Sequence, residues 1–227
     1  MTLAQISAKT SQASGCEGVH LWLTLLWLAL CTTFVHADTG VPDAANALQG
    51  HALVQALQRG GFVVYFRHAD TGPAYAEQPP IVLERCETQR NLNDDGRAQA
   101  QAIGAQFRRL RIPVGDIVTS EFCRCWQTAE LAFGRYRKDS TLTGVSRSAE
   151  AQPRRDQASA GLRRLLGTVP QTGTNTVLVS HGYNLLDLER FHLGQQGEAA
   201  IFRPDGRGGY VLIARVLPGV WAELPAP

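Results

Sequence analysis

The 227-residue sequence lacks a dominant charge, with 22 lysines and arginines against 20 aspartates and glutamates. The formal net charge is therefore only +2, and no dense basic run is interleaved with aromatic residues. Proteins that bind nucleic acid cluster positive charge to neutralise phosphates, so nucleic acid is not an expected partner. Internal repeats and low-complexity linkers are also missing. At 44% hydrophobic and 19% charged, the composition is typical of a single globular domain.

The sequence also lacks an apolar run of the roughly 20 residues that a transmembrane helix needs. Its longest apolar stretch, residues 21–35, is followed by Ala37, a small residue suited to signal peptidase. These features predict a signal peptide at 1–37 and a mature domain at 38–227, periplasmic or secreted, without stable membrane association after cleavage. The region before the apolar stretch is poorly charged, so an uncleaved N-terminal anchor is the alternative.

Cysteine is scarce, and two of the five, Cys16 and Cys31, fall in the predicted leader. An exported domain sees an oxidising compartment, so the remaining three predict one disulfide and one free thiol. We expect Cys86 to pair with Cys123 or Cys125. Three cysteines without a nearby fourth ligand do not predict a zinc site, and we expect no metal and no cofactor.

Two apolar, β-type runs each end in a histidine. Residues 62–66 precede Arg67 and His68, and residues 176–180 precede His181. Continuous apolar runs are typical of buried parallel strands. Because ligand sites in open α/β sheets lie beyond the carboxyl ends of the strands, these runs predict an anion site beside a nucleophile.

The remaining pattern alternates between helix and strand. Helices are predicted over residues 44–58, 93–110, 123–133, 153–166 and 183–191. Further strands are predicted over residues 116–120, 142–145, 199–203 and 210–216, the last two flanking a turn-rich connection. This order predicts a three-layer α/β/α sandwich with a mainly parallel sheet and a C-terminal antiparallel hairpin.

A third strand end supplies a second arginine to the predicted site. The strand at 116–120 leads to Arg124 in the first turn of a helix, whose N-terminus favours anions. Guanidinium groups match phosphate oxygens, and a neutral imidazole attacks phosphorus in line. Two arginines and two histidines therefore predict a pocket for a phosphate monoester, with a phosphohistidine intermediate and with cationic side chains in place of a metal.

Four segments together resemble a known family. Residues 66–71, Phe-Arg-His-Ala-Asp-Thr, resemble the Arg-His-Gly signature of the histidine phosphatase superfamily, which includes the phosphoglycerate mutases. Residues 120–129 are similar to its second-arginine segment, and residues 179–182 to its second-histidine strand. Residues 91–100 resemble the helix between them. The resemblance extends over about 62–181, and by the same pattern to residue 216.

The resemblance implies that His68 is the phosphorylated nucleophile and that Arg67, Arg124 and His181 form the phosphate pocket. Together with the predicted leader, the resemblance leads us to expect an exported phosphomonoesterase that acts on a small-molecule or glycan phosphomonoester. Two alternatives stay open at this point: a phosphate-binding pseudo-enzyme, and a phosphotransferase of the phosphoglycerate mutase type.

The sequence departs from the family pattern at two positions. Ala69 replaces the usual glycine, and Ala74 stands where many mutase-like members have asparagine, so hydrolysis is favoured over mutase activity. Arg90 and Asn91 are the two candidates to replace that asparagine contact. The general acid that protonates the leaving oxygen is expected to be Glu198, with Glu150 as its rival.

Overall fold

The computed structural model describes residues 47–72, 77–146 and 148–226. The predicted leader at 1–37 and Ala74 lie outside the described residues, so both calls stay predictions. Among the helices that are described, none is long and apolar enough to cross a membrane.

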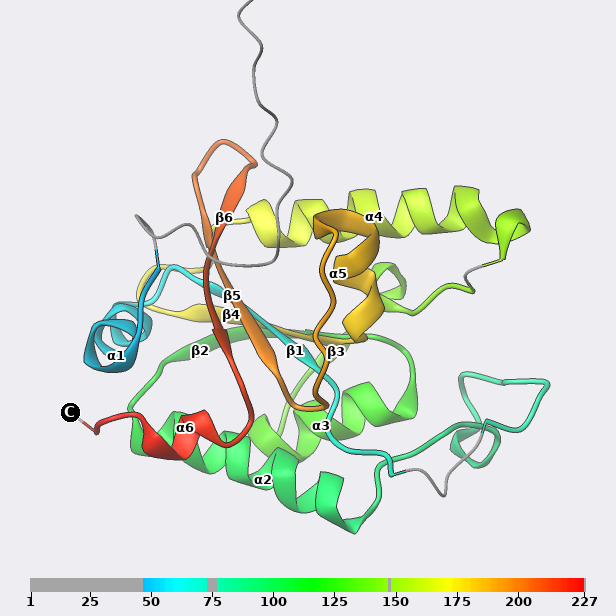
Figure 1. Cartoon of the computed structure of the whole chain (residues 1–227), viewed down its shortest axis with the longest axis horizontal. Helices are drawn as coiled ribbons and strands as arrows, with labels where there is room; N and C mark the ends of the chain where they lie inside the picture. The colour runs from blue at the N-terminus through cyan, green and yellow to red at the C-terminus, as the bar shows by residue number, and fades with distance from the viewer. Residues whose placement is uncertain (1–46, 73–76, 147, 227) are drawn as a thin grey trace, which may run out of the picture. The chain divides into compact units, whose positions relative to one another are not determined.

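One six-stranded sheet organises the described residues, in the order β3-β2-β4-β1-β5-β6 (Figure 1). The strands are β1 (Val63–Arg67), β2 (Val114–Thr119), β3 (Arg137–Lys138), β4 (Asn175–Ser180), β5 (Ala199–Pro204) and β6 (Tyr210–Val216). The strands β1, β2, β3 and β4 pair in parallel, whereas β5 runs antiparallel to both β1 and β6. The predicted parallel sheet with a C-terminal antiparallel hairpin is confirmed.

Helices cover both faces of this sheet, as the predicted three-layer sandwich requires. They are α1 (Gly50–Arg59), α2 (Asp94–Arg109), α3 (Cys123–Phe133), α4 (Gln152–Gly167), α5 (Gly182–Glu189) and α6 (Val220–Glu223). Figure 1 shows α4 and α5 on one side of the sheet and α2, α3 and α6 on the other. Short 3₁₀ turns lie at Cys86–Thr88, Ser140–Leu142 and Ala149–Ala151.

The central strand β1 divides its side chains between two hydrophobic clusters. Val64 and Phe66 pack with α1, α2, α3 and α6, whereas Val63 and Tyr65 pack with α4 and α5. Successive side chains of a strand point to opposite faces, so a strand buried on both faces needs apolar residues at every position. This explains the uninterrupted apolar run that precedes Arg67.

One predicted strand, residues 142–145, is wrong. Residues Ser140–Leu142 form a 3₁₀ turn, and the edge strand is the two-residue β3, which precedes it. The carboxylate of Asp139 accepts a hydrogen bond from the Thr141 backbone N–H at 3.0 Å, which starts the turn and ends the strand. Leu142 is fully buried, so its apolar character reflects packing under α4 rather than strand pairing.

Helix α1 begins at Gly50, later than the predicted residue 44, and residues 47–49 are not helical.

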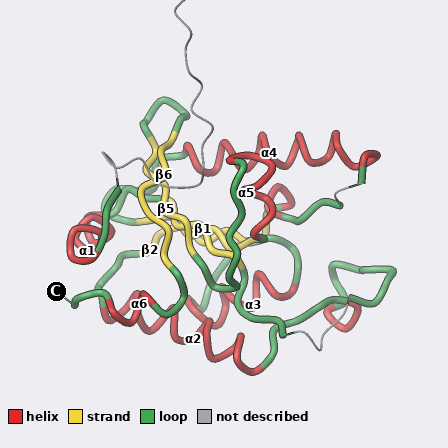
Figure 2. The backbone as a smooth tube through the Cα atoms, in the orientation of Figure 1, coloured by secondary structure: helices red, strands yellow, loops and turns green. Residues whose placement is uncertain are grey.

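In the described part of the connection between β1 and α2, residues 68–72 and 77–93, the turn Cys86–Thr88 is the one regular element (Figure 2). Where it enters α2, the Asn93 side chain caps the helix by accepting a hydrogen bond from Gly96 N at 2.7 Å. A Cβ atom on Gly96 would lie 1.9 Å from the carbonyl oxygen of Asp70. Glycine at this position therefore allows the start of α2 to pack directly against the backbone that follows His68.

Candidate active site

A cavity of about 510 Å³ lies beyond the carboxyl ends of β1 and β4. Arg67, His68, Arg124 and His181, which the sequence predicts to form one site, all line it. The parallel register of β1 and β4 opposes Arg67 to Ser180, so the next residue of each strand is a histidine. As a result, the rings of His68 and His181 lie side by side, with their centroids 5.7 Å apart.

The geometry of His68 suits a nucleophile. Its ring is buried, and its Nδ1 atom lies 2.8 Å from the carbonyl oxygen of Ala69. A carbonyl oxygen only accepts, so Nδ1 carries the proton and Nε2 carries the lone pair. Burial, and next the charge of Arg124, hold the pKa of His68 well below its usual value of 6.5. His68 is therefore neutral at neutral pH.

His181 is held between two polar neighbours. Its Nε2 atom lies 3.0 Å from Ser120 Oγ, and its Nδ1 atom lies 3.5 Å from the guanidinium of Arg124. Since a guanidinium only donates, Nδ1 is the lone-pair nitrogen and Nε2–H donates to the serine. Burial, followed by the charge of Arg124, lowers the pKa of His181 well below 6.5. The second imidazole is thus neutral as well.

Arg124 is the most buried of the cavity arginines, with 6% of its surface exposed. Its guanidinium carbon lies 4.2 Å from the centroid of the Phe122 ring, a cation–π contact that fixes the plane of the group. The guanidinium also donates to the Glu77 carboxylate at 3.2 Å, whereas its Nε is buried and has no partner among the described residues. Burial is the main cause that lowers the pKa of Arg124.

The spacing of Ser120, Arg124 and Thr128 has a direct structural explanation. Ser120 directly follows β2 and contacts His181, and Arg124 extends from the first turn of α3 into the cavity. One turn later, Thr128 Oγ1 donates to the Arg124 carbonyl at 2.7 Å and accepts from the Ala69 backbone N–H at 3.0 Å. One segment therefore connects the backbone that follows His68 with Arg124 and His181.

Arg67 is oriented by backbone carbonyls on the other side of the cavity. Its NH1 atom donates to Leu193 O at 3.1 Å and also to Gly194 O. Burial is the main cause that lowers the pKa of Arg67. The segment before β5 also binds the main chain here, because Arg67 N donates to Glu198 O at 3.0 Å and Gly197 N to His68 O at 3.0 Å.

Two charged residues of the β1–α2 connection complete the cavity. Arg90 lines it, and its buried Nε has no partner among the described residues. From the sequence, Arg90 is only a candidate replacement for the missing asparagine contact. A loop sequence has no periodic pattern that would predict that the segment around Arg90 folds back over β1. Asn91, the other suggested substitute, instead donates to the carbonyl oxygens of Cys86 and Gln89. Glu77 is the second such residue, and the sequence gives no signal for it.

The structure does not bring the two predicted proton donors into the cavity. Glu198 is buried, and its carboxylate binds Arg215 at 2.6 and 3.0 Å and the Gln195 backbone N–H at 3.1 Å. Glu150 is exposed, and hydrogen bonds from its own backbone N–H and then from Ser148 lower its pKa. A lowered pKa favours the ionised form, which cannot donate a proton. Neither carboxylate lines the cavity.

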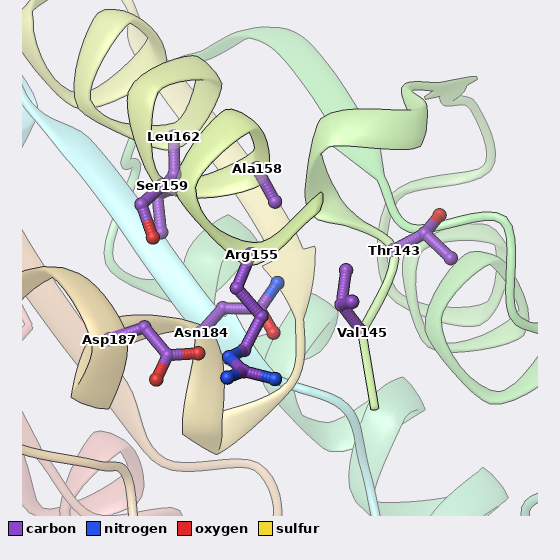
Figure 3. A pocket seen from close by; sticks show the side chains of 8 residues that line it. All are labelled: Thr143, Val145, Arg155, Ala158, Ser159, Leu162, Asn184 and Asp187. Atoms are coloured by element: carbon purple, nitrogen blue, oxygen red, sulfur yellow. The ribbon is translucent and has the colours of Figure 1, made fainter. Parts of the chain in front are cut away.

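A second hollow, between α4 and α5, is too small to bind a substrate. It is lined by Thr143, Val145, Arg155, Ala158, Ser159, Leu162, Asn184 and Asp187 (Figure 3). Its volume of about 10 Å³ barely holds one water molecule. Among the residues that the structure describes, no group of three or more histidine, cysteine, aspartate or glutamate side chains is placed to hold a metal.

Comparison with known families agrees with this geometry. Residues 65–145 match the sequence model of the histidine phosphatase superfamily (branch 1). The predicted resemblance to this superfamily is confirmed. The matched residues include the nucleophile segment of the histidine phosphatase pattern, its connecting helix and its second arginine. His181 lies beyond them, and the parallel register of β4 brings it to the same cavity.

Several solved structures are similar to the chain. The protein histidine phosphatase SixA complexed with tungstate is 18% identical, with a TM-score of 0.46, over 70% of this chain and 98% of that one. A putative phosphohistidine phosphatase SixA from Agrobacterium tumefaciens is 20% identical, with a TM-score of 0.45, over 70% and 99%. Phosphoserine phosphatase from Entamoeba histolytica is 15% identical, with a TM-score of 0.49, over 69% and 96%. None of the curated proteins matches the chain.

Proposed function

We propose that this protein is an exported phosphomonoesterase that hydrolyses a phosphate monoester through a phosphohistidine on His68. The observation that supports this most directly is the Nδ1 hydrogen bond from His68 to the Ala69 carbonyl oxygen. It leaves Nε2 as the lone-pair nitrogen of a neutral ring that lines a cavity with three arginines. A small molecule or a phosphorylated glycan is the substrate, and no cofactor takes part.

The reaction divides into two displacements at phosphorus. In the first, His68 Nε2 forms the P–N bond while the ester P–O bond breaks and the leaving oxygen takes up a proton. In the second, water attacks the phosphohistidine, the P–N bond breaks and inorganic phosphate leaves. Arg67, Arg124 and Arg90 supply fixed positive charge to the equatorial oxygens, where negative charge builds in the transition state.

His181 contributes in a different way from the arginines. In the free protein its Nε2–H donates to Ser120 and its Nδ1 lone pair faces Arg124, so it offers no proton to an anion. A bound phosphate dianion beside the ring favours the imidazolium form, which then donates from Nδ1. We therefore propose that phosphate binding is accompanied by protonation of His181.

The proton for the leaving oxygen comes from the cavity wall. Glu77 lines the cavity and touches Arg124, whereas the carboxylate of Glu198 is bound to Arg215 outside it. We propose Glu77 as the donor in place of Glu198.

The decisive test replaces the nucleophile. His68→Ala lowers kcat on p-nitrophenyl phosphate by more than about 1,000-fold, since the loss of a nucleophile raises the barrier by several kcal/mol. His51→Ala, at an exposed position on α1, is the matched control and keeps wild-type activity. A His68→Ala enzyme that keeps more than about a tenth of kcat contradicts the nucleophile assignment.

The same assay separates the two alternatives. A phosphate-binding pseudo-enzyme releases no p-nitrophenol at all, although inorganic phosphate still binds. A mutase-type phosphotransferase returns a rearranged, still phosphorylated product from a diphosphorylated sugar acid, whereas a phosphomonoesterase releases inorganic phosphate.

A further inference from the structure

One wall of the cavity is formed by residues 77–91, which we call the wall segment. Glu77, Ile81 and Arg90 of this segment line the cavity. The segment is loop apart from the 3₁₀ turn Cys86–Thr88 and adds no strand to the sheet. Its position over the phosphate pocket therefore depends on contacts that lie outside regular secondary structure.

Hydrogen bonds inside the wall segment give it a defined shape. Gln78 N donates to Thr88 O at 3.0 Å, and Val82 N donates to Thr88 Oγ1 at 3.0 Å. The buried side chain of Gln89 donates to Val82 O at 3.1 Å and to Leu83 O at 3.0 Å. These bonds join the segment only to itself, so they do not determine where it lies relative to His68.

The attachments of the wall segment to α3 all fall on the first two residues of that helix, Cys123 and Arg124. They are the Cys86–Cys123 disulfide, a hydrogen bond from Cys123 N to Gln89 Oε1 at 2.8 Å, and bonds from Arg124 NH1 to Glu77 Oε1 at 3.2 Å and to Arg90 O at 3.4 Å. The disulfide is the one covalent link among these four, and Glu77 is 36% exposed.

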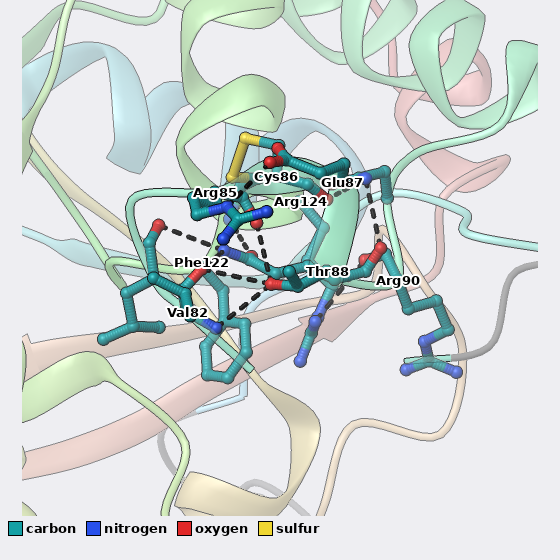
Figure 4. The surroundings of a disulfide bond; sticks show 12 residues. Val82, Arg85, Cys86, Glu87, Thr88, Arg90, Phe122 and Arg124 are labelled. Atoms are coloured by element: carbon teal, nitrogen blue, oxygen red, sulfur yellow. Dashed lines mark hydrogen bonds and ion pairs between the residues drawn. A yellow bond between two sulfur atoms is a disulfide. The ribbon is translucent and has the colours of Figure 1, made fainter. Parts of the chain in front are cut away.

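The disulfide lies behind the residues that face the cavity. Figure 4 shows it on one side of the wall segment, with the side chains of Arg90 and Phe122 extending from the other side. The buried Nε of Arg90 has no partner among the described residues. The position of the Arg90 guanidinium therefore follows the position of its main chain, which is four residues from Cys86.

We propose that the Cys86–Cys123 disulfide is a positioning element of the active site, which holds Arg90 beside Arg124 and makes phosphate binding dependent on oxidation. This inference rests on the proposed function, because it names a control on the same pocket. A dithiol that reduces the bond becomes a disulfide itself and leaves two protein thiols. The wall segment then keeps only its hydrogen bonds to α3, and Arg90 is no longer confined to the pocket. The enzyme is thus suited to an oxidising compartment.

A double-mutant cycle tests whether the disulfide acts through Arg90. The four proteins are wild type, Arg90→Ala, the Cys86→Ser/Cys123→Ser variant and the triple variant. The readouts are kcat and KM on p-nitrophenyl phosphate and the inhibition constant of inorganic phosphate. Loss of a hydrogen bond to a charged group costs about tenfold in affinity. We therefore expect each change alone to raise the phosphate inhibition constant about tenfold, and Arg90→Ala to add less than about threefold once the disulfide is gone.

Controls separate positioning from general loosening of the fold. Glu87→Ala lies in the same turn, in an exposed ion pair with Arg85, and leaves the inhibition constant unchanged. If the double serine variant does not fold, wild-type protein is reduced with dithiothreitol after folding, its far-UV circular dichroism is checked, and the inhibition constant is measured before reduction, after reduction and after re-oxidation. Arg90→Ala serves as the reference, since its phosphate affinity then changes little on reduction.

Two results overturn the inference: an unchanged phosphate inhibition constant without the disulfide, or an equal cost of Arg90→Ala with and without it. These outcomes are distinct from failure of the proposed function. A protein that never releases phosphate but binds it in a disulfide-dependent way refutes the phosphatase assignment and supports the positioning role. An active enzyme whose phosphate binding does not depend on the disulfide supports the phosphatase assignment and refutes the positioning role.

Discussion

The two buried histidines predict a specific loss of stability in mild acid. The pKa values of His68 and His181 are both held well below 6.5, first by burial. In the unfolded chain a histidine titrates near 6.5, so between the two values the unfolded state binds more protons. The free energy of unfolding therefore rises with pH in this window. The contribution of the two neutral histidines is fully present above pH 6.5 and is lost as the pH falls below 6.5.

The size of the effect follows from the same linkage. For each histidine that stays neutral in the native state, the free energy of unfolding falls by about 1.4 kcal/mol between pH 7.5 and pH 5.5, since only the unfolded state gains the proton. His68 and His181 together lose about 2.7 kcal/mol, a large part of the 5–15 kcal/mol that stabilises an ordinary domain. Carboxylates with lowered pKa values, such as Asp139, add their own loss only at lower pH.

Urea unfolding at pH 7.5, 6.5 and 5.5 measures this loss, in buffers free of phosphate because a bound anion stabilises the native state. We expect His68→Asn and His181→Asn each to reduce the fall between pH 7.5 and pH 5.5 by about 1.4 kcal/mol relative to wild type. His51→Asn, on the exposed side of α1, is the control for the substitution itself. If both active-site variants retain the wild-type pH dependence, the histidines are not buried and neutral in the native protein, and the nucleophile argument loses its basis.

Three further predictions concern the proton donor, metal dependence and processing. Glu77→Gln loses at least about tenfold more activity on a sugar phosphate than on p-nitrophenyl phosphate, whose leaving group departs without a proton, whereas Glu198→Gln and Glu150→Gln show no such split in steady-state kinetics. We expect activity to survive dialysis against EDTA. If EDTA abolishes activity and added zinc or magnesium restores it, this prediction is wrong. Intact-mass measurement of exported protein finds a start near Asp38 and one disulfide, and three thiols that alkylate without reduction contradict the bridge.

The sheet was largely predictable because its strands are buried on both faces. Residues 63–66 of β1 and 177–179 of β4 are buried and apolar at every position, so these runs mark both the strands and the edge where they end. Parallel pairing then places the following residues together without further information. The disulfide was predicted only as a choice between two partners for Cys86, and the structure selects Cys123.

Loop residues were not predictable in the same way. Leu142 has the apolar neighbourhood of a strand, but the side chain of Asp139 competes for the backbone and starts a turn instead. Arg90 and Glu77 enter the cavity because the wall segment folds back onto the first turn of α3. Those contacts join residues far apart in the sequence, and no periodic pattern in the sequence predicts them.

Glu198 shows that a residue can lie at the edge of the sheet beside the cavity while its side chain stays outside the cavity. The sequence predicts that Glu198 opens a strand packed beside the His181 strand, but the structure pairs that strand, β5, with β1 instead: the Glu198 carbonyl oxygen accepts from Arg67 N, and Ala199 pairs with Phe66. The side chain nevertheless lies outside the cavity, because β6 brings Arg215 opposite Ala200 and the carboxylate binds that guanidinium. A buried carboxylate is stable only when it is paired, so the nearest cation decides its direction. Strand order locates the main chain of Glu198, whereas the register of the hairpin, which the sequence does not reveal, excludes its carboxylate from the cavity.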